Sequence, residues 1–264
     1  MRPLIPLEGA TASYEPPSLH NFQFGGIYGG PDWLNRPLVQ AVAAAIIVIA
    51  FWLWASRQLK TVPTRRQFVF EYFYEFIRNG VARDALGHDF RKYVPYLLGL
   101  FSFIWVNNLF EIFFLTMFPT MANIGYAWAL AIIAWIVYNW AGVRRHGVGG
   151  YLRRSLFPSG VPAPLYVLVT PIEFMSNILI RPLTLGLRLF GNMFAGHLVV
   201  LVFVVGGSYL MLHGSQPIYH VAGVVSLLFS FLIFALELLV CTLQAYIFTV
   251  LTAQYVASSI ADEH

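Results

Sequence analysis

Charged residues are scarce in this chain. Only 11% of its 264 residues are Asp, Glu, Lys or Arg, whereas about 25% is typical of a soluble domain. Hydrophobic residues make up 58% of the sequence. A soluble all-α protein would need polar faces on its outer helices, and the apolar runs of this chain contain almost no polar positions. The composition therefore predicts a membrane-embedded protein.

Cysteine and the common ligand-binding patterns are also nearly absent. Cys241 is the single cysteine, which excludes an intramolecular disulfide and a four-cysteine metal site. The seven histidines are scattered without close ligand spacing, and the sequence contains no glycine-rich phosphate loop or nucleophile motif. We therefore expect no cofactor, no metal ion and no covalent catalysis on this chain.

Five apolar runs are long enough to cross a bilayer, for which a helix needs about 20 residues. They cover residues 38–56, 94–118, 124–142, 163–206 and 217–256. The last two runs exceed the membrane thickness, so their helices must tilt or bend. Kink points in the first of them are Pro162, Pro164, Pro171 and Pro182. The runs predict an all-α polytopic membrane protein, one membrane domain over 1–264, in which 163–256 forms a long tilted hairpin.

Basic residues are concentrated in two stretches, 57–92 and 144–154, which hold twelve of the sixteen Lys and Arg residues. The connections at 119–123 and 206–219 carry none. Because basic loops remain on the cytoplasmic side, we expect an exposed amino-terminal arm over 1–36 outside and a cytoplasmic carboxyl terminus. This topology also accounts for the net charge of +4, so a nucleic-acid partner is not expected.

Two polar segments separate the apolar runs. Residues 65–82 mix aromatic and charged side chains, which predicts an amphipathic helix lying on the cytoplasmic membrane surface. Glycine and arginine dominate residues 143–155. This composition predicts a flexible loop that its charge holds near anionic lipid headgroups.

Charged side chains within the apolar runs are candidates for function, because each costs about 2.5 kcal/mol or more at membrane depth. They are Glu111, Glu173, Arg181, Arg188 and Glu237. A histidine in the fourth run, at position 197, adds an imidazole that titrates near neutral pH.

Arg188 lies too far from both ends of its run to reach an interface easily, so it needs an anionic partner. At about 100° per residue, Arg188 and Asn192 share a stripe of the helix, whereas His197 points to the opposite side. The arginine and the histidine are therefore expected to serve different surfaces. A structural salt bridge from Arg188 to Glu237 or Glu111 is the alternative interpretation.

Polar groups on the other helices favour a proton path. Asn107, Asn108 and Glu111 are spaced to form a patch on one side of the second run. Asparagines alone could merely join helices by hydrogen bonds, but the carboxylate adds a titratable group. In the last run, Glu237 and Gln244 share a face. If Glu237 lies at a depth similar to that of His197, the two would make a proton relay.

Three segments resemble ATP synthase subunit a. Residues Arg181–His197 read RPLTLGLRLFGNMFAGH and closely resemble the signature of that family. LQAYIFTVLTAQYVASS at 243–259 and NNLFEIFF at 107–114 are similar to two further family segments. The resemblance extends over roughly residues 20–260.

The resemblance implies roles for individual residues. Arg188 would be the rotor-facing arginine, with Asn192 beside it and Gln244 opposite on the last helix. An aqueous inlet from outside would be lined by Asn108, Glu111, His197 and Glu237. Some members of the family exchange the acidic residue and the histidine between the last two of these positions, which preserves the pair.

The resemblance also implies a mechanism and partners. The chain would be the stator proton-channel subunit, with two offset half-channels that couple proton flow to rotor rotation and ATP synthesis, without a catalytic site of its own. Its partners would be a ring of c subunits, the b subunits of the peripheral stalk and the lipid of a bacterial plasma membrane. Specificity for protons or sodium ions remains open here, because the ion-binding carboxylate belongs to another chain. A secondary transporter and a structural membrane subunit are the competing interpretations.

Overall fold

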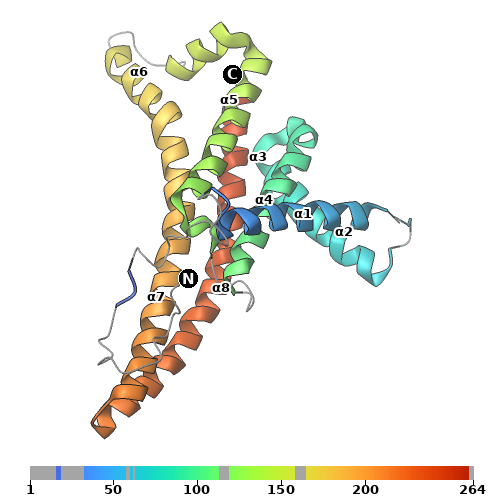
Figure 1. Ribbon diagram of the computed structural model, residues 1–264. Coiled ribbons are helices and arrows are strands. Elements are labelled where there is room, and N and C mark those ends of the chain that lie inside the picture. Colours follow the sequence, from blue (N-terminus) through green and yellow to red (C-terminus); the bar gives the residue numbers. More distant parts are fainter. Residues whose placement is uncertain are drawn as a thin grey trace. The chain divides into compact units, whose positions relative to one another are not determined.

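The computed structural model describes residues 16–18, 33–57, 60–61, 63–112, 119–157 and 165–261, and within these ranges the regular secondary structure is helical. Five helical segments are long and apolar enough to cross a membrane. They are Arg36–Ser56, Arg65–Glu111, Ile124–Leu156, Tyr166–His213 and Pro217–Ile260. The predicted all-α polytopic fold is confirmed (Figure 1). Most of the predicted amino-terminal arm, together with Pro162 and Pro164, lies outside the described residues.

The chain divides into two compact units. The smaller unit contains residues 198–235, where the end of α7 (Arg181–His213) and the start of α8 (Pro217–Ile260) form a helical hairpin. Within it, Ser226 donates a hydrogen bond to the Phe203 carbonyl at 2.8 Å. A Cβ atom on Gly223 would lie 2.8 Å from the Gly207 carbonyl oxygen. Glycine at this crossing therefore allows the two backbones to approach closely.

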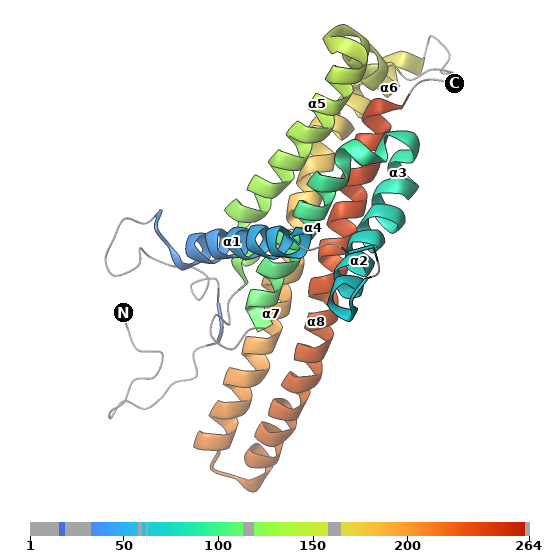
Figure 2. The same cartoon turned by 90° about the vertical axis from the view of Figure 1, so that its right-hand side faces the viewer.

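The larger unit contains residues 24–197 and 236–264. Its first helix, α1 (Arg36–Ser56), is capped by the Asn35 side chain, which accepts from the Leu38 amide. The Trp52 indole donates to Ser102 in α4 (Phe90–Ile112) at 3.1 Å. Within this unit, α1 runs across the direction of the α8 segment in both views (Figures 1 and 2).

The predicted helix over 65–82 is present but does not end there. α2 (Arg65–Ile77) continues through a π-helical turn, Arg78–Arg83, into α3 (Asp84–Leu86). A 3₁₀ turn, Gly87–Asp89, then leads into α4. Gly87 has φ of 56°, which glycine adopts readily, and this residue lets the chain turn back so that Phe73 packs against Phe101.

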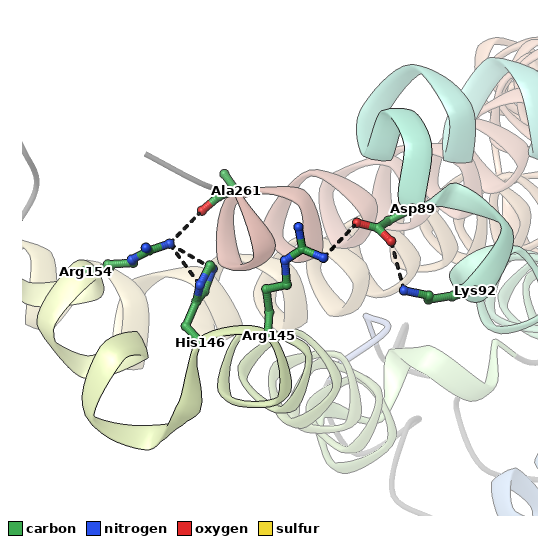
Figure 3. A network of polar contacts seen from close by, with 6 residues as sticks. All are labelled: Asp89, Lys92, Arg145, His146, Arg154 and Ala261. Atoms are coloured by element: carbon green, nitrogen blue, oxygen red, sulfur yellow. Dashed lines mark hydrogen bonds and ion pairs between the residues drawn. The ribbon is translucent and has the colours of Figure 1, made fainter. Parts of the chain in front are cut away.

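The prediction of a flexible loop over 143–155 is wrong. α5 (Ile124–Leu156) continues through this segment as helix, interrupted only at Gly147, where φ is 73°. After that kink, Tyr151 returns to donate to Asn139 Oδ1 at 2.8 Å and fills the space beside Gly142. Arg154 Nη1 contacts His146 Nδ1 at 2.9 Å and the Ala261 carbonyl at 3.5 Å (Figure 3). These contacts order a segment that its composition alone would leave mobile.

The helix that leads into α7 is anchored to α5. α6 (Tyr166–Met175) contains Pro171 and is followed by a π-helical turn, Ser176–Ile180. In this turn, the Asn177 carbonyl accepts from Tyr138 at 2.8 Å, and its side chain donates to Ser155 Oγ at 2.9 Å. The anchored turn fixes the start of α7, which carries the candidate site.

Candidate functional site

Arg188 lies on an exposed stripe of α7 with Thr184 and Asn192, whereas Leu185 and Leu189 face the interior. Among the described residues, no carboxylate lies within ion-pair distance of the Arg188 guanidinium. The alternative salt bridge to Glu111 or Glu237 is therefore not formed. The guanidinium is presented to the outside of this unit instead.

A second group of polar side chains meets behind that stripe, where α4, α7 and α8 pack together. The Nδ1 atom of His197 lies 3.2 Å from Oε1 of Glu111. The Glu237 side chain also reaches the Glu111 carboxyl group. Both carboxyl residues are only 4% exposed. The sequence suggested Glu237 as the histidine's partner, and the structure places Glu111 at ion-pair distance.

The lack of a side chain at Gly196 leaves room for the Glu237 carboxyl group. A Cβ atom at Gly196 would collide with the Glu237 carboxyl oxygen. Because glycine has no side chain, the carboxyl group can lie directly against the α7 backbone. Two carboxyl groups in contact can share a hydrogen bond only when one carries a proton, so the Glu111 and Glu237 pair is able to hold a proton between them.

Asn108 and Cys241 complete this group. Asn108 is 1% exposed and donates to the Cys241 carbonyl at 3.1 Å. The Cys241 thiol lies 3.7 Å from Glu111 Oε2. From the sequence, Cys241 only excluded a disulfide and a four-cysteine metal site, and no part in this group was predicted for it. The signal that could have found it is its spacing of four residues from Glu237, which places both side chains on one helix face.

Asn192 and Gln244 connect the exposed stripe of α7 to the inner face of α8. Asn192 Nδ2 donates to Gln244 Oε1 at 2.6 Å. Gln244 is 1% exposed, and its Nε2 atom has no hydrogen-bond partner among the described residues. The resemblance implied that Gln244 lies opposite Arg188, and the structure shows Gln244 in contact with Asn192.

A separate polar cavity lies near the start of α7. Its volume is about 260 Å³, and its walls include Glu173, Asn177 and Arg181 together with Tyr151 and Ser259. The sequence identified Glu173 and Arg181 as charges within an apolar run but gave them no role. The structure brings these two opposite charges to one cavity, and the Arg181 guanidinium lies 5.1 Å from the centre of the Tyr255 ring.

Comparisons with a family model and with individual proteins match the same family. The model of the family described as ATP synthase A chain matches residues 38–257. A protein named ATP synthase subunit a from Nocardioides sp. is 43% identical to this chain, and the match covers 95% of each. The subunit a of Frankia alni is 38% identical over 87% of this chain and 78% of its own length. That of Pseudarthrobacter chlorophenolicus is 35% identical over 96% of both.

Proposed function

Because the chain belongs to the ATP synthase A chain family, we propose that it forms the stationary part of a proton path through the membrane. Protons reach carboxyl groups on a ring of c subunits through one half-channel and leave through a second, offset one. Each proton that crosses about 100 mV releases roughly 2.3 kcal/mol. Rotation of the ring couples this energy to ATP synthesis elsewhere in the complex.

The observation that carries the proposal is the exposed Arg188, which has no carboxylate partner among the described residues although it lies within an apolar helix. An arginine at membrane depth requires an anionic partner, and a carboxylate on a neighbouring subunit supplies one. Its guanidinium stays protonated in any plausible environment. Arg188 therefore attracts an ionised ring carboxylate, repels a passing proton and does not itself carry protons across.

The group formed by Asn108, Glu111, His197 and Glu237 supports one half-channel. Its imidazole and two carboxyl groups are mutually close, so a proton can move between them over short distances. Oxygen atoms Asn108 Oδ1 and Glu237 Oε1 have no hydrogen-bond partner among the described residues. Buried polar atoms of this kind are usually satisfied by ordered water, which extends a proton path.

The cavity lined by Glu173 and Arg181 supports the second half-channel. Along α7, His197 follows Arg188 by nine residues and Arg181 precedes it by seven. At about 1.5 Å per residue, these polar regions lie roughly 13 Å and 10 Å from the arginine along the helix. The two regions therefore lie on opposite sides of Arg188 along α7, and both distances are shorter than the roughly 30 Å of hydrocarbon. Two half-channels separated by Arg188 require this order.

The arrangement of the larger unit supports an oblique course for the parts of the predicted hairpin that belong to this unit, residues 165–197 and 236–256. α1 is long and apolar enough to cross the membrane, and it runs across the direction of the α8 segment (Figure 2). Helices that cross in this way cannot both follow the membrane normal. Under this proposal, α1 spans the membrane and the α8 segment lies tilted, with one broad side against the curved ring.

The remaining parts of the proposal concern partners and location. The partners are the c ring, the b subunits of the peripheral stalk and membrane lipid. The chain lies in a bacterial plasma membrane, with the amino terminus outside and the carboxyl terminus in the cytoplasm. Residues 65–82 lie at the cytoplasmic surface, and catalysis takes place on other subunits.

The test is ATP-driven proton pumping in membrane vesicles that carry Arg188→Ala, with complex assembly measured by copurification of the other subunits. We expect an assembled complex that does not pump. Arg153→Gln is the control, because it removes one exposed charge whose side chain does not line the cavity near the start of α7. Near-normal pumping by Arg188→Ala would refute the proposal.

Two other outcomes identify the competing functions. Loss of assembly in Arg188→Ala, with Arg153→Gln intact, would favour a structural subunit. Proton transport by the purified chain in liposomes without a ring would favour a secondary transporter.

A further inference from the structure

A cavity of about 670 Å³ opens between the start of α4 and the middle of α5, apart from both polar regions described above. Basic side chains at its mouth are Lys92, Arg144 and Arg145. The apolar part of its wall includes Ile136 and Val137. The cavity therefore changes from basic to apolar along α5.

Among the described residues that line this cavity, the basic side chains outnumber the acidic one. Lys92 Nζ lies 2.9 Å from Asp89 Oδ1, and Arg145 Nη1 lies 3.8 Å from Oδ2 of the same carboxylate (Figure 3). One carboxylate thus faces two cations. Arg144 is exposed and forms no ion pair within the described part of the chain. Arg144 is therefore the cation at this cavity that an anionic ligand can pair with most directly.

The order of side chains along α5 matches the order of groups in a phospholipid. Arg144 and Arg145 follow directly after the apolar run. Trp140, one turn earlier, lines the cavity and is 66% exposed, and tryptophan is enriched where headgroups meet acyl chains. One turn earlier again lies Ile136, which is 52% exposed. Charge, aromatic ring and aliphatic surface thus succeed one another toward the membrane interior.

We propose that this cavity binds an anionic phospholipid. The headgroup phosphate lies among Lys92, Arg144 and Arg145, and an acyl chain follows the exposed aliphatic face at Ile136. Arginine offers paired N–H donors that fit phosphate oxygens, and basic pockets at the ends of membrane helices bind anionic headgroups. Free phosphate shares the headgroup chemistry, but it would leave the aliphatic wall unused, and the continuity of that wall favours the lipid.

The experiment uses the intact ATP synthase complex in phosphatidylcholine vesicles. A phosphatidylglycerol probe with a photoactivatable acyl chain is added at increasing mole fractions, and labelled peptides from α4 and α5 are quantified by mass spectrometry. Each basic residue near a membrane surface contributes about a five-fold change in the binding of an anionic lipid. We therefore expect Arg144→Gln to require about five-fold more probe for half-maximal labelling.

Three comparisons make the result specific. Arg153→Gln removes one exposed charge from the same helix outside the cavity and should label as the unchanged complex does. A phosphatidylcholine probe should label these peptides weakly and without saturation, and excess inorganic phosphate should not displace the phosphatidylglycerol probe. Equal effects of the two arginine substitutions, equal labelling by both probes, or displacement by inorganic phosphate would each overturn the proposal.

Discussion

His197 Nδ1 and Glu111 Oε1, on α7 and α4, lie 3.2 Å apart. The histidine is half-buried, and the carboxyl group is shielded from the surface of this chain. Contact at this distance allows a proton to pass directly between an imidazole and a carboxylate. The pair is thus the part of the candidate inlet in which an imidazole and a carboxyl group lie at ion-pair distance.

Replacing the carboxyl group of Glu111 should interrupt that transfer. Glu111→Gln keeps the size of the side chain but cannot exchange a proton at Oε1. Because groups that transfer protons commonly contribute about 100-fold or more to a rate, we expect ATP-driven proton pumping to fall by a comparable factor. Pumping would be measured as acidification of vesicles that contain the assembled complex. Glu75→Gln, on the exposed face of α2, is the matched control, and equal pumping by the two variants would contradict the prediction.

Gly196 should be intolerant of a side chain. In Gly196→Ala the new methyl group would displace the Glu237 carboxyl oxygen. Because Glu237 is buried and has little room to move, we expect a lower thermal unfolding temperature and impaired pumping. Gly191→Ala is the matched control for unfolding of the purified chain, because a Cβ atom at Gly191 meets nothing within 4 Å. Alanine is favoured over glycine in a helix by about 1 kcal/mol, so Gly191→Ala should be neutral or stabilising. A Gly196→Ala chain as stable as Gly191→Ala would show that Glu237 can move away freely.

The hydrogen bond between Asn192 and Gln244 should appear as a coupling between two substitutions. Asn192→Ala and Gln244→Ala would be made singly and together, and the free energy of unfolding measured for each purified chain. Hydrogen bonds between membrane helices contribute about 0.6 kcal/mol on average in such cycles, and we expect a value of that order. Additive effects of the two substitutions would mean that this 2.6 Å contact does not stabilise the packing of α7 on α8.

Gly147 should be required for the folded-back end of α5. Its φ of 73° and ψ of 164° lie in a region that essentially only glycine adopts and that costs other residues about 1–3 kcal/mol, so Gly147→Ala should weaken the contacts of Tyr151 and Arg154. We expect faster amide hydrogen exchange over residues 148–156. Gly149→Ala is the control, since Gly149 has neither a positive φ nor an atom within 4 Å of a new Cβ. Equal exchange in the two variants would argue against strain at Gly147.

Much of the candidate site could be predicted from the sequence, because it depends on helical periodicity. The opposite orientations of Arg188 and His197 follow from about 100° of rotation per residue, and the structure places the first on the exposed stripe and the second against Glu111. The patch formed by Asn107, Asn108 and Glu111 follows from the same rule, and all three side chains are buried. Periodicity specifies the face of a helix on which a residue lies. Which other helix packs against that face depends on the tertiary structure.

The number of long helices was determined by the sequence alone. A bilayer offers no hydrogen-bond partners to the backbone, so an apolar run of sufficient length must be helical. Tertiary structure decided which helices meet. It brought Glu111 to His197, placed Cys241 beside that pair, and folded residues 148–156 back onto Gly142. Those contacts depend on space left by glycines and on side chains from distant segments, and no local pattern of residues specifies either.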